Sequence, residues 1–154
     1  MSIDQARARL REAGLEDRII EFTVSSATVA LAAQALQCEP AHIAKTLSFE
    51  HGEGAILVVA AGDARIDNAK FKHRFGMKAR MLSADRVEQL IGHGVGGVCP
   101  FGVKPGVPVY LDESLRRFGI VYPAAGTSSS AVRLTIDELE RASACEGWVD
   151  VCRI

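Results

Sequence analysis

The sequence predicts a single α/β domain, residues 1–154, with helices on the faces of a mixed sheet that is mostly antiparallel or barrel-like. Short apolar runs typical of strands alternate irregularly with amphipathic stretches typical of helices, and several predicted strands are joined as hairpins. The chain has 154 residues, of which 48% are hydrophobic and 24% charged. This length and composition suffice for one hydrophobic core and argue against disorder. The irregular order of elements argues against a doubly wound nucleotide-binding fold.

The first half of the chain is predicted to be mainly regular structure. Its helices cover residues 3–13, 28–37 and 68–75, and its strands cover residues 18–23, 44–50 and 55–61. Ser25 or Ser26 is the candidate cap of the second helix, and Gly76 ends the third. A glycine-containing loop at residues 51–54 joins the last two strands into a predicted β-hairpin.

The second half is richer in loops. Helices are predicted over residues 84–91, 114–118 and 136–142, and strands over residues 79–82, 109–111, 119–122, 132–134 and 148–151. Ser83 and Thr135 are the candidate caps of the first and last of these helices, and Glu138 completes a capping box with Thr135. Residues 92–108 contain six glycines and three prolines, and residues 124–130 are mostly small. Both segments are therefore predicted to be loops.

Several classes of function leave no motif in the sequence. There is no GxSxG hydrolase elbow, no P-loop and no GxGxxG dinucleotide motif. The four cysteines lack a CxxC pair, and the four histidines do not form a metal-ligand array. No apolar run approaches the roughly 20 residues of a membrane span, and the first residues do not resemble a secretory signal. We therefore expect free thiols, no metal or cofactor, no membrane partner and a cytoplasmic location.

Positive charge is concentrated between residues 64 and 80. Six basic residues there accompany one acidic residue, although the whole chain has a formal charge of −1. The basic residues are Arg65, Lys70, Lys72, Arg74, Lys78 and Arg80. Such a patch can attract a phosphate backbone, and Lys70, Lys72 and Arg74 are its candidate contacts. On charge alone, a solvated surface helix is the more ordinary interpretation.

Lys45 stands near the start of an apolar predicted strand. In a cleft, its ammonium group would offer three hydrogen-bond donors to a phosphate or a carbonyl oxygen. An edge-strand lysine that prevents aggregation is the ordinary alternative. Without other information, we favour the edge-strand interpretation of Lys45.

Two loops of small residues are the other candidates for a binding site. In residues 96–102 (Gly-Gly-Val-Cys-Pro-Phe-Gly), the glycines allow the backbone to approach a ligand closely, and Pro100 stiffens the loop. Residues 126–130 (Gly-Thr-Ser-Ser-Ser) offer hydroxyl groups to a small polar ligand. Tight connections and turns with local side-chain hydrogen bonds explain both loops without a ligand.

Cys99 lies in the first of these loops, and His93 precedes it in the sequence. A thiol-dependent enzyme needs a base within hydrogen-bond reach of the sulfur. Nothing in the sequence demonstrates that contact, so a nucleophilic Cys99 is the weakest of the hypotheses.

Taken in order, these features resemble the YbaK family of free-standing aminoacyl-tRNA deacylases, whose fold also occurs as the editing insertion of bacterial prolyl-tRNA synthetases. An Ala-rich helix is followed by residues 44–47 (Ala-Lys-Thr-Leu) and residues 58–63 (Val-Val-Ala-Ala-Gly-Asp). The 96–102 loop comes next, and the Gly126 loop then leads into residues 132–134 and a helix. The resemblance covers residues 28–139.

The resemblance implies hydrolysis of mischarged tRNA without a protein nucleophile or a metal. Lys45 is implied to hold the terminal nucleotide or the ester, while Gly96, Gly97 and Pro100 belong to the loop whose backbone contacts the aminoacyl group. Water attacks the ester with help from the ribose hydroxyl of the terminal adenosine. Aminoacyl esters are already activated, so positioning and oxyanion stabilisation suffice. The further residues assigned to substrate binding are Thr28, Thr46, Val98, Cys99, Phe101, Gly102, Gly126, Ser128 and Ser129.

Two departures from the family pattern concern the substrate. Cys99 stands where many relatives have serine or threonine, and residues 127–130 contain more hydroxyl groups than the usual version of that loop. A pocket lined by hydroxyls favours serine, threonine or alanine esters. Cysteine is a further candidate amino acid, and the tRNA for proline is the candidate carrier.

The expected partners are mischarged tRNA and, as a further candidate, an aminoacyl-tRNA synthetase; no DNA partner is expected. The alternative function is a module that binds the acceptor end of tRNA, or a synthetase, without catalysis. The basic segment at residues 64–80 motivates that alternative, because phosphate contacts supply affinity that depends on salt.

Overall fold

The computed structural model describes residues 2–24, 28–94 and 96–154. Its helices are α1 (Ser2–Glu12), η1 (Glu16–Arg18), α2 (Val29–Leu36), η2 (Pro40–His42), α3 (Asn68–Phe75), α4 (Ala84–Ile91), η3 (Glu113–Arg117) and α5 (Ile136–Ser143), where η marks a 3-10 helix. The strands are β1 (Ile19–Glu21), β2 (Ile43–His51), β3 (Gly54–Ala61), β4 (Arg65–Ile66), β5 (Val109–Asp112), β6 (Ile120–Pro123), β7 (Ser130–Val132), β8 (Leu134–Thr135), β9 (Gly147–Val149) and β10 (Cys152–Arg153). None of the helices in these described ranges is long and apolar enough to cross a membrane.

Six strands form the main sheet, in the order β8-β6-β2-β3-β5-β9. The long β2–β3 hairpin pairs antiparallel from Ala44 and Ala61 to His51 and Gly54. β6 pairs parallel with β2, and β5 pairs parallel with both β3 and β9. Across the described residues, four of the seven strand pairs are antiparallel. The predicted single domain with a mixed, mostly antiparallel sheet is confirmed, and the sheet curls as a half-barrel.

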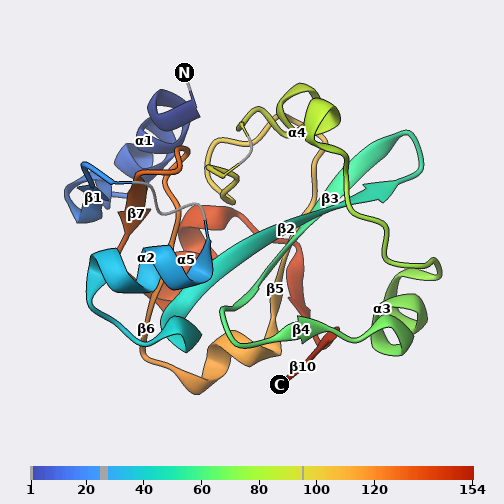
Figure 1. Cartoon of the computed structure of the whole chain (residues 1–154). Helices are drawn as coiled ribbons and strands as arrows, with labels where there is room; N and C mark the ends of the chain where they lie inside the picture. The colour runs from blue at the N-terminus through green and yellow to red at the C-terminus, as the bar shows by residue number, and fades with distance from the viewer. Residues whose placement is uncertain (1, 25–27, 95) are drawn as a thin grey trace.

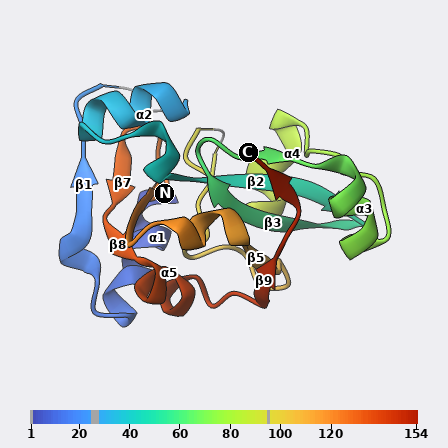
Figure 2. The same ribbon diagram turned by 90° about the horizontal axis from the view of Figure 1, so that it is seen from below.

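The β2–β3 hairpin crosses the molecule, with α2 near one end and α3 near the other (Figures 1 and 2). Two small sheets flank it, one formed by β1 and β7 and one by β4 and β10. The second places Cys152 opposite Ile66, just before α3. The C-terminal strand is therefore attached to the segment that connects β3 to the basic helix.

The hydrophobic core lies between the main sheet and the helices. Residues 55–61 of β3 are all buried, so the strand is a continuous apolar run rather than an alternating one. α1 contributes Ala6 and Leu10 to the core, and α5 contributes Leu139 and Ala142. Both helices are amphipathic because only one stripe of each can reach the sheet.

A row of aromatic rings attaches α3 to the sheet. Phe71 lies 4.8 Å from Phe49 of β2 and 4.8 Å from Phe75, and Phe75 lies 5.2 Å from Tyr110 of β5, measured between ring centroids. Pairs of aromatic rings at these distances add about 0.5–1.5 kcal/mol beyond their buried area. The apolar face of α3 is thus fixed, which leaves its basic side chains on the outside.

The predicted ends of three helices are confirmed. Gly76 ends α3 in the left-handed conformation, with φ of 71°. Thr135 caps α5, and Glu138 completes the predicted capping box. Ser83 occupies the N-cap position of α4 as predicted, although its side chain makes no capping hydrogen bond.

The start of α2 differs from the prediction. Ser25 and Ser26, the candidate caps, lie outside the described residues. Thr28, predicted as the first helical residue, is instead the N-cap, because its hydroxyl accepts a hydrogen bond of 3.1 Å from the backbone N–H of Leu31. The helix ends at Leu36, and Gln37 is its C-cap in the left-handed conformation, with φ of 56°.

Other expected elements are shorter or divided. Residues 79–82 form only an isolated bridge, between Met81 and Phe49, rather than a strand. The predicted helix at residues 114–118 is the 3-10 helix η3. The strand predicted at residues 132–134 falls partly in β7 and partly in β8, which pair with different partners. The strand predicted at residues 148–151 corresponds to β9, which ends earlier, at Val149, and the separate strand β10 begins only at Cys152 and pairs with β4. The hydrophobic periodicity of the sequence does not indicate where a strand changes its pairing partner.

Candidate functional site

A cavity of about 340 Å³ opens beside the first half of β2. α2, the start of α4, the 96–98 segment and the β6–β7 connection supply its other walls. The lining residues are Thr28, Val29, Ala32, Ile43, Ala44, Lys45, Thr46, Ser48, Met81, Leu82, Ala84, Val87, Gly96, Val98, Tyr122, Ala124, Ser130 and Ala131. Apolar side chains predominate among them, with a few polar groups between, as is usual for a small-molecule site.

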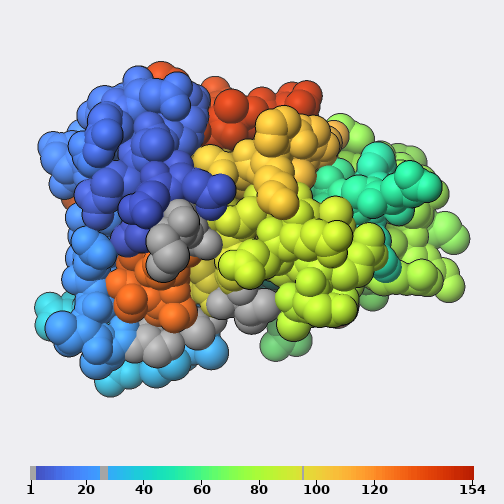
Figure 3. Space-filling model, turned by 90° about the horizontal axis from the view of Figure 1, so that it is seen from above, coloured from blue at the N-terminus to red at the C-terminus, as the bar shows by residue number. Residues whose placement is uncertain are grey.

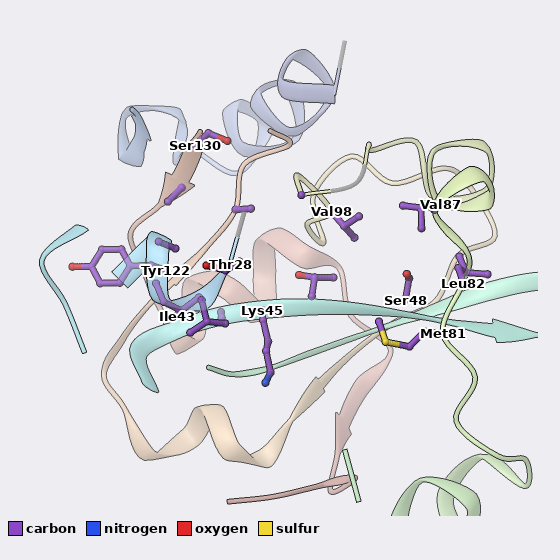
Figure 4. Close-up of a pocket in the computed structure, with 18 residues that line it drawn as sticks. Thr28, Ile43, Lys45, Ser48, Met81, Leu82, Val87, Val98, Tyr122 and Ser130 are labelled. Atoms are coloured by element: carbon purple, nitrogen blue, oxygen red, sulfur yellow. The ribbon is translucent and has the colours of Figure 1, made fainter. Parts of the chain in front are cut away.

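Figure 3 shows the face on which α1 (blue), α4 (yellow-green) and the loop near residue 130 (orange) lie next to one another. Val98 and Val87 lie on the same side of β2 in the close-up of the cavity, and Ser48 points toward that side from the strand (Figure 4). Segments far apart in the sequence therefore form one site.

Lys45 contributes to the cavity wall, but its ammonium group lies on the other side of the strand. Side chains alternate between the two faces of a strand. Figure 4 accordingly shows Lys45 pointing away from Ser48 and Val98. Lys45 is among the residues of the cavity wall, yet the sequence does not indicate to which face of β2 its ammonium group turns.

The ammonium group of Lys45 binds the turn that follows β3. It donates hydrogen bonds to the carbonyl oxygen of Gly62, at 3.4 Å, and to that of Ala64. A lysine has three donors, so within the described structure one is left for a ligand. Burial lowers the pKa of Lys45, and the nearby Cys152 thiol and Asp63 carboxylate oppose that change. Among the described residues, Lys45 is held by backbone carbonyl groups rather than by an ion pair.

Gly62 allows this turn to come close to η2. A Cβ atom at Gly62 would lie 2.0 Å from the carbonyl oxygen of Pro40, a distance that no side chain tolerates. The turn therefore keeps its carbonyl oxygens within reach of Lys45 only because residue 62 has no side chain.

Thr46 supplies a hydroxyl group on the cavity wall. Its Oγ1 atom is buried, and none of the described residues forms a hydrogen bond with it. Leaving a buried hydroxyl unpaired costs about 1–3 kcal/mol. A ligand that hydrogen-bonds to Thr46 would recover that free energy, so Thr46 stays a candidate for substrate binding. Two positions further along the same face, Ser48 lines the cavity and was missed by the sequence analysis.

The first half of the 96–102 loop forms part of the cavity wall. Gly96 and Val98 line the cavity, and Gly96 is left-handed with φ of 89°. Gly97 lies against the second loop, because a Cβ atom there would be 2.5 Å from the carbonyl oxygen of Gly126 and 2.6 Å from the Cα atom of Thr127. The two loops singled out in the sequence are therefore in direct backbone contact.

The second half of that loop turns into the core. Cys99 and Phe101 have no exposed surface, and Pro100 is buried. Gly102 lies against α1, where a Cβ atom would be 2.4 Å from the carbonyl oxygen of Gln5. These four residues, expected to touch the substrate, lie outside the cavity lining and instead support the part of the loop that reaches it.

The Cys99 thiol does contact His93, but both side chains are fully buried. The sulfur lies 3.5 Å from the Nε2 atom of His93. Burial raises the pKa of the Cys99 thiol to about 12, so at neutral pH it is not a thiolate. Since the thiolate is the nucleophile and substrate cannot reach this sulfur, the structure contradicts a nucleophilic Cys99.

The second loop uses its hydroxyl groups to hold its own shape. Ser130 is buried, and its Oγ atom accepts hydrogen bonds from the backbone N–H groups of Ala125 and Thr127 at 3.3 Å and 3.2 Å. The Thr127 hydroxyl lies 2.9 Å from the same oxygen. Gly126, Ser128 and Ser129, assigned to substrate binding, are not among the cavity-lining residues. Ser130 lines the cavity and was absent from that assignment.

The candidate tRNA contacts Lys70, Lys72 and Arg74 lie on α3, at the other end of the hairpin from α2 (Figures 1 and 2). Lys70 donates hydrogen bonds of 3.0 Å to the Asp150 carboxylate and to the carbonyl oxygen of Cys152. The guanidinium carbon of Arg74 lies 5.0 Å from the centre of the Phe75 ring. Lys72 is exposed. Exposed ion pairs contribute little to stability, so these charges remain available to a partner.

The chain passes from the basic segment directly to the cavity. Residues 80–82 run along β2. The backbone N–H of Glu50 donates a hydrogen bond to the carbonyl oxygen of Arg80, and the backbone N–H of Leu82 donates to the carbonyl oxygen of Ser48. Met81 and Leu82 then line the cavity, and the Met81 side chain is 56% exposed. Neither Met81 nor Leu82 belongs to a sequence motif, so only the fold shows that they line the cavity.

The four cysteines are free thiols, and no group of three His, Cys, Asp or Glu residues within the described ranges is placed to hold a metal ion. The polar groups of the cavity are therefore hydroxyls and backbone amides, and the Lys45 ammonium group lies on the opposite face of β2. Such groups can position a substrate and stabilise negative charge on an oxygen atom.

Comparison with known proteins assigns this arrangement to a family. Residues 23–142 match the family model described as "Aminoacyl-tRNA editing domain". The chain is 47% identical to the uncharacterized protein YwhH of Bacillus subtilis (strain 168) over 154 residues, which cover 99% of this chain and 98% of that protein. The match therefore extends beyond the motifs to the whole chain.

Two further relatives connect the fold to proline-specific enzymes. The chain is 29% identical over 119 residues to a proline–tRNA ligase of Lysinibacillus sphaericus (strain C3-41), covering 75% of this chain and 20% of that ligase. A crystal structure described as that of a candidate trans-editing enzyme for prolyl tRNA synthetase matches with a TM-score of 0.88 and 30% identity, covering 99% and 98% of the two chains. The chain belongs to the aminoacyl-tRNA editing domain family, as the motifs in its sequence predicted.

Proposed function

We propose that this protein hydrolyses the ester bond of mischarged aminoacyl-tRNA, with a small amino acid such as alanine, serine, threonine or cysteine attached to the tRNA for proline. The observation that carries the proposal is a cavity of about 340 Å³ in an editing-domain fold, bounded by Lys45, Thr46 and the paired glycine loops. This volume lies near the lower end of the roughly 300–1,000 Å³ of small-molecule sites.

In the proposed reaction the protein positions reactants instead of supplying a nucleophile. Water attacks the carbonyl carbon of the ester, the ribose hydroxyl of the terminal adenosine assists, and the tRNA leaves as the alcohol. Lys45 has one donor left, and because its ammonium group lies on the face of β2 opposite the cavity, its proposed contact is the terminal nucleotide rather than the ester. Alignment of reactants in an enclosed site can lower a barrier by several kcal/mol, which suits an ester that is already activated.

Selection among amino acids is proposed to depend on the size of the cavity. The loop hydroxyls that suggested a hydroxylated amino acid do not support that choice, since the Ser130 oxygen is occupied within its own loop. The other hydroxyl-bearing residues of the cavity wall are Thr28, Thr46, Ser48 and Tyr122, and apolar residues such as Val87 and Val98 lie between them. One additional methylene group in such a site changes binding by about 1–3 kcal/mol.

The basic residues of α3 are proposed to contact the tRNA backbone while the acceptor end enters the cavity. Lys72 and Arg74 are exposed, and residues 80–82 lead from α3 to the cavity wall. This same surface favours the second candidate function, a module that binds the acceptor end or a synthetase without catalysis. A cytoplasmic location, where charged tRNA is used, belongs to the proposal as well.

The test is incubation of the purified protein with tRNA for proline carrying alanine, serine, threonine, cysteine or proline, followed by measurement of ester loss above the uncatalysed rate. We expect selective release of one or more of the wrong amino acids and little release of proline. Tight, salt-dependent tRNA binding without release from any of these substrates would favour the binding module and contradict the proposed reaction.

A further inference from the structure

His93 is a buried polar residue outside the cavity. Its side chain has no exposed surface, and it follows α4 directly before the 96–102 loop. Its Nδ1 atom is buried, and no described residue forms a hydrogen bond with it. Burial of this kind lowers the pKa of His93, so the ring is neutral at physiological pH.

The hydrogen bond of His93 fixes which nitrogen carries the proton. Nε2 lies 2.6 Å from the backbone carbonyl oxygen of Phe101. A carbonyl oxygen only accepts, so Nε2 must be the donor and Nδ1 carries the lone pair. The Cys99 thiol is 3.7 Å from the same oxygen and is its second donor.

This hydrogen bond joins the two ends of the loop that reaches the cavity. His93 stands before the loop and Phe101 near its end, while Val98 between them lines the cavity. Two further contacts fix the loop. The N–H of Gly97 donates to the carbonyl oxygen of Gly94 at 3.0 Å, and Gly97 itself lies against the second loop.

We propose that His93 is a positioning residue for the editing site, whose Nε2–H holds the Phe101 carbonyl so that Gly96 and Val98 stand at the cavity wall. The histidine touches neither the cavity nor the substrate and acts only through the loop. Without the hydrogen bond, the loop keeps its glycine contacts but loses the attachment beneath Val98. The catalytic part of this inference rests on the proposed deacylase function, whereas the attachment of the loop does not.

The experiment compares three variants with the wild-type protein. His93→Leu has similar volume but no donor, and His93→Gln restores an N–H donor on an unbranched side chain. His51→Leu is the matched control, because His51 is exposed at the end of β2 and lies outside the cavity lining. For each protein we would measure kcat and KM for release of the wrong amino acid, and amide hydrogen exchange of residues 96–102.

We expect His93→Leu to lower kcat by about 10- to 100-fold, since small misplacements of a site have effects of that size. KM should change less, and exchange should accelerate in residues 96–102 but not in the β2–β3 hairpin. His93→Gln should restore much of both properties, and His51→Leu should change neither. Wild-type kcat and wild-type loop protection in His93→Leu would overturn the proposal.

Two other outcomes are distinguishable. Faster exchange throughout His93→Leu, hairpin included, without rescue by His93→Gln, would assign His93 a general role in stability and reject a positioning role. Absence of ester release by the wild-type protein would contradict the proposed function. The exchange data would then still decide whether His93 attaches the loop.

Discussion

The cavity and the basic helix α3 are built by different means. The region of the cavity depends on close backbone contacts, with Gly97 against Gly126 beside the cavity wall and Gly62 against Pro40 at the turn that holds Lys45. The basic segment has its buried side attached by aromatic rings, and its charges face solvent on the other side. A site built from close contacts tolerates little change, whereas exposed charges act additively and are screened by salt. We therefore expect chemistry to depend on the first region and tRNA affinity on the second.

The largest effect is expected from Gly97→Ala. The added Cβ atom would lie 2.5 Å from the carbonyl oxygen of Gly126, so the two loops must separate. Deacylation should fall by more than about 100-fold, and overpacking should lower the free energy of unfolding by about 1–3 kcal/mol. Steady-state kinetics and urea unfolding measure the two effects.

Gly119→Ala is the matched control for that substitution. A Cβ atom at Gly119 meets no atom within 4 Å, and its backbone is not left-handed. Its stability should stay within about 0.5 kcal/mol of wild type, with full activity. Wild-type activity in Gly97→Ala would show that the contact between the loops is irrelevant to the cavity.

Lys45→Ala should have the next largest effect. Its ammonium group has one donor left for the substrate, so its removal should lower kcat/KM by about 100-fold or more. Melting temperature should change little, because each lost hydrogen bond contributes only about 0.5–1.5 kcal/mol. Lys104→Ala is the control, since the exposed Lys104 also donates to a backbone carbonyl, that of Gln89 at 2.6 Å. Full activity in Lys45→Ala would remove this lysine from the mechanism.

Much of the fold could be predicted from the sequence because local rules determine it. The capping box of Thr135 and Glu138, the end of α3 at Gly76 and the β2–β3 hairpin follow from residue types at fixed spacing. Strands that change their pairing partner were less predictable. Between β7 and β8, the backbone N–H of Arg133 donates a hydrogen bond to the carbonyl oxygen of Arg18, and the two strands on either side pair with different neighbours.

The site was only partly predictable, because burial and direction are tertiary properties. The motif around Lys45 indicated the correct strand, but only the pairing of β2 decides which face receives the ammonium group. Cys99 and Phe101 belong to the same loop as Val98, yet they turn into the core. Met81 entered the cavity wall without any motif, since residues 80–82 reach it through backbone hydrogen bonds to β2.

Charge reversal on α3 should have a smaller effect of a different kind. We expect the combined variant Lys70→Glu, Lys72→Glu and Arg74→Glu to raise KM for tRNA about tenfold at low salt, with kcat unchanged. The difference should shrink as salt screens the charges. Arg133→Glu is the control for charge reversal at an exposed arginine outside α3, because Arg133 is exposed and lies outside the cavity lining. A change in kcat, or no change in KM, would contradict the separation of the two regions.

The smallest expected effect is on the free energy of unfolding at acidic pH, through the buried residue His93. Burial lowers the pKa of His93 in the folded protein, so below about pH 6.5 the unfolded state binds more protons than the folded state. The stability contributed by neutral His93 is therefore complete above that pH and is lost as pH falls. The contacting Cys99 thiol, with its pKa raised to about 12, stays protonated throughout this range.

Urea unfolding of the wild type and of His93→Leu at a series of pH values from 7.5 to 5 isolates this contribution, since other titrating groups affect both proteins alike. The difference in free energy of unfolding between the two should shift against the wild type as the solution becomes more acidic. A constant difference would mean that His93 takes up a proton equally well in the folded and unfolded states. It would also mean that water or a donor reaches Nδ1. The surroundings of His93 would then be more accessible to solvent than the full burial of its side chain indicates.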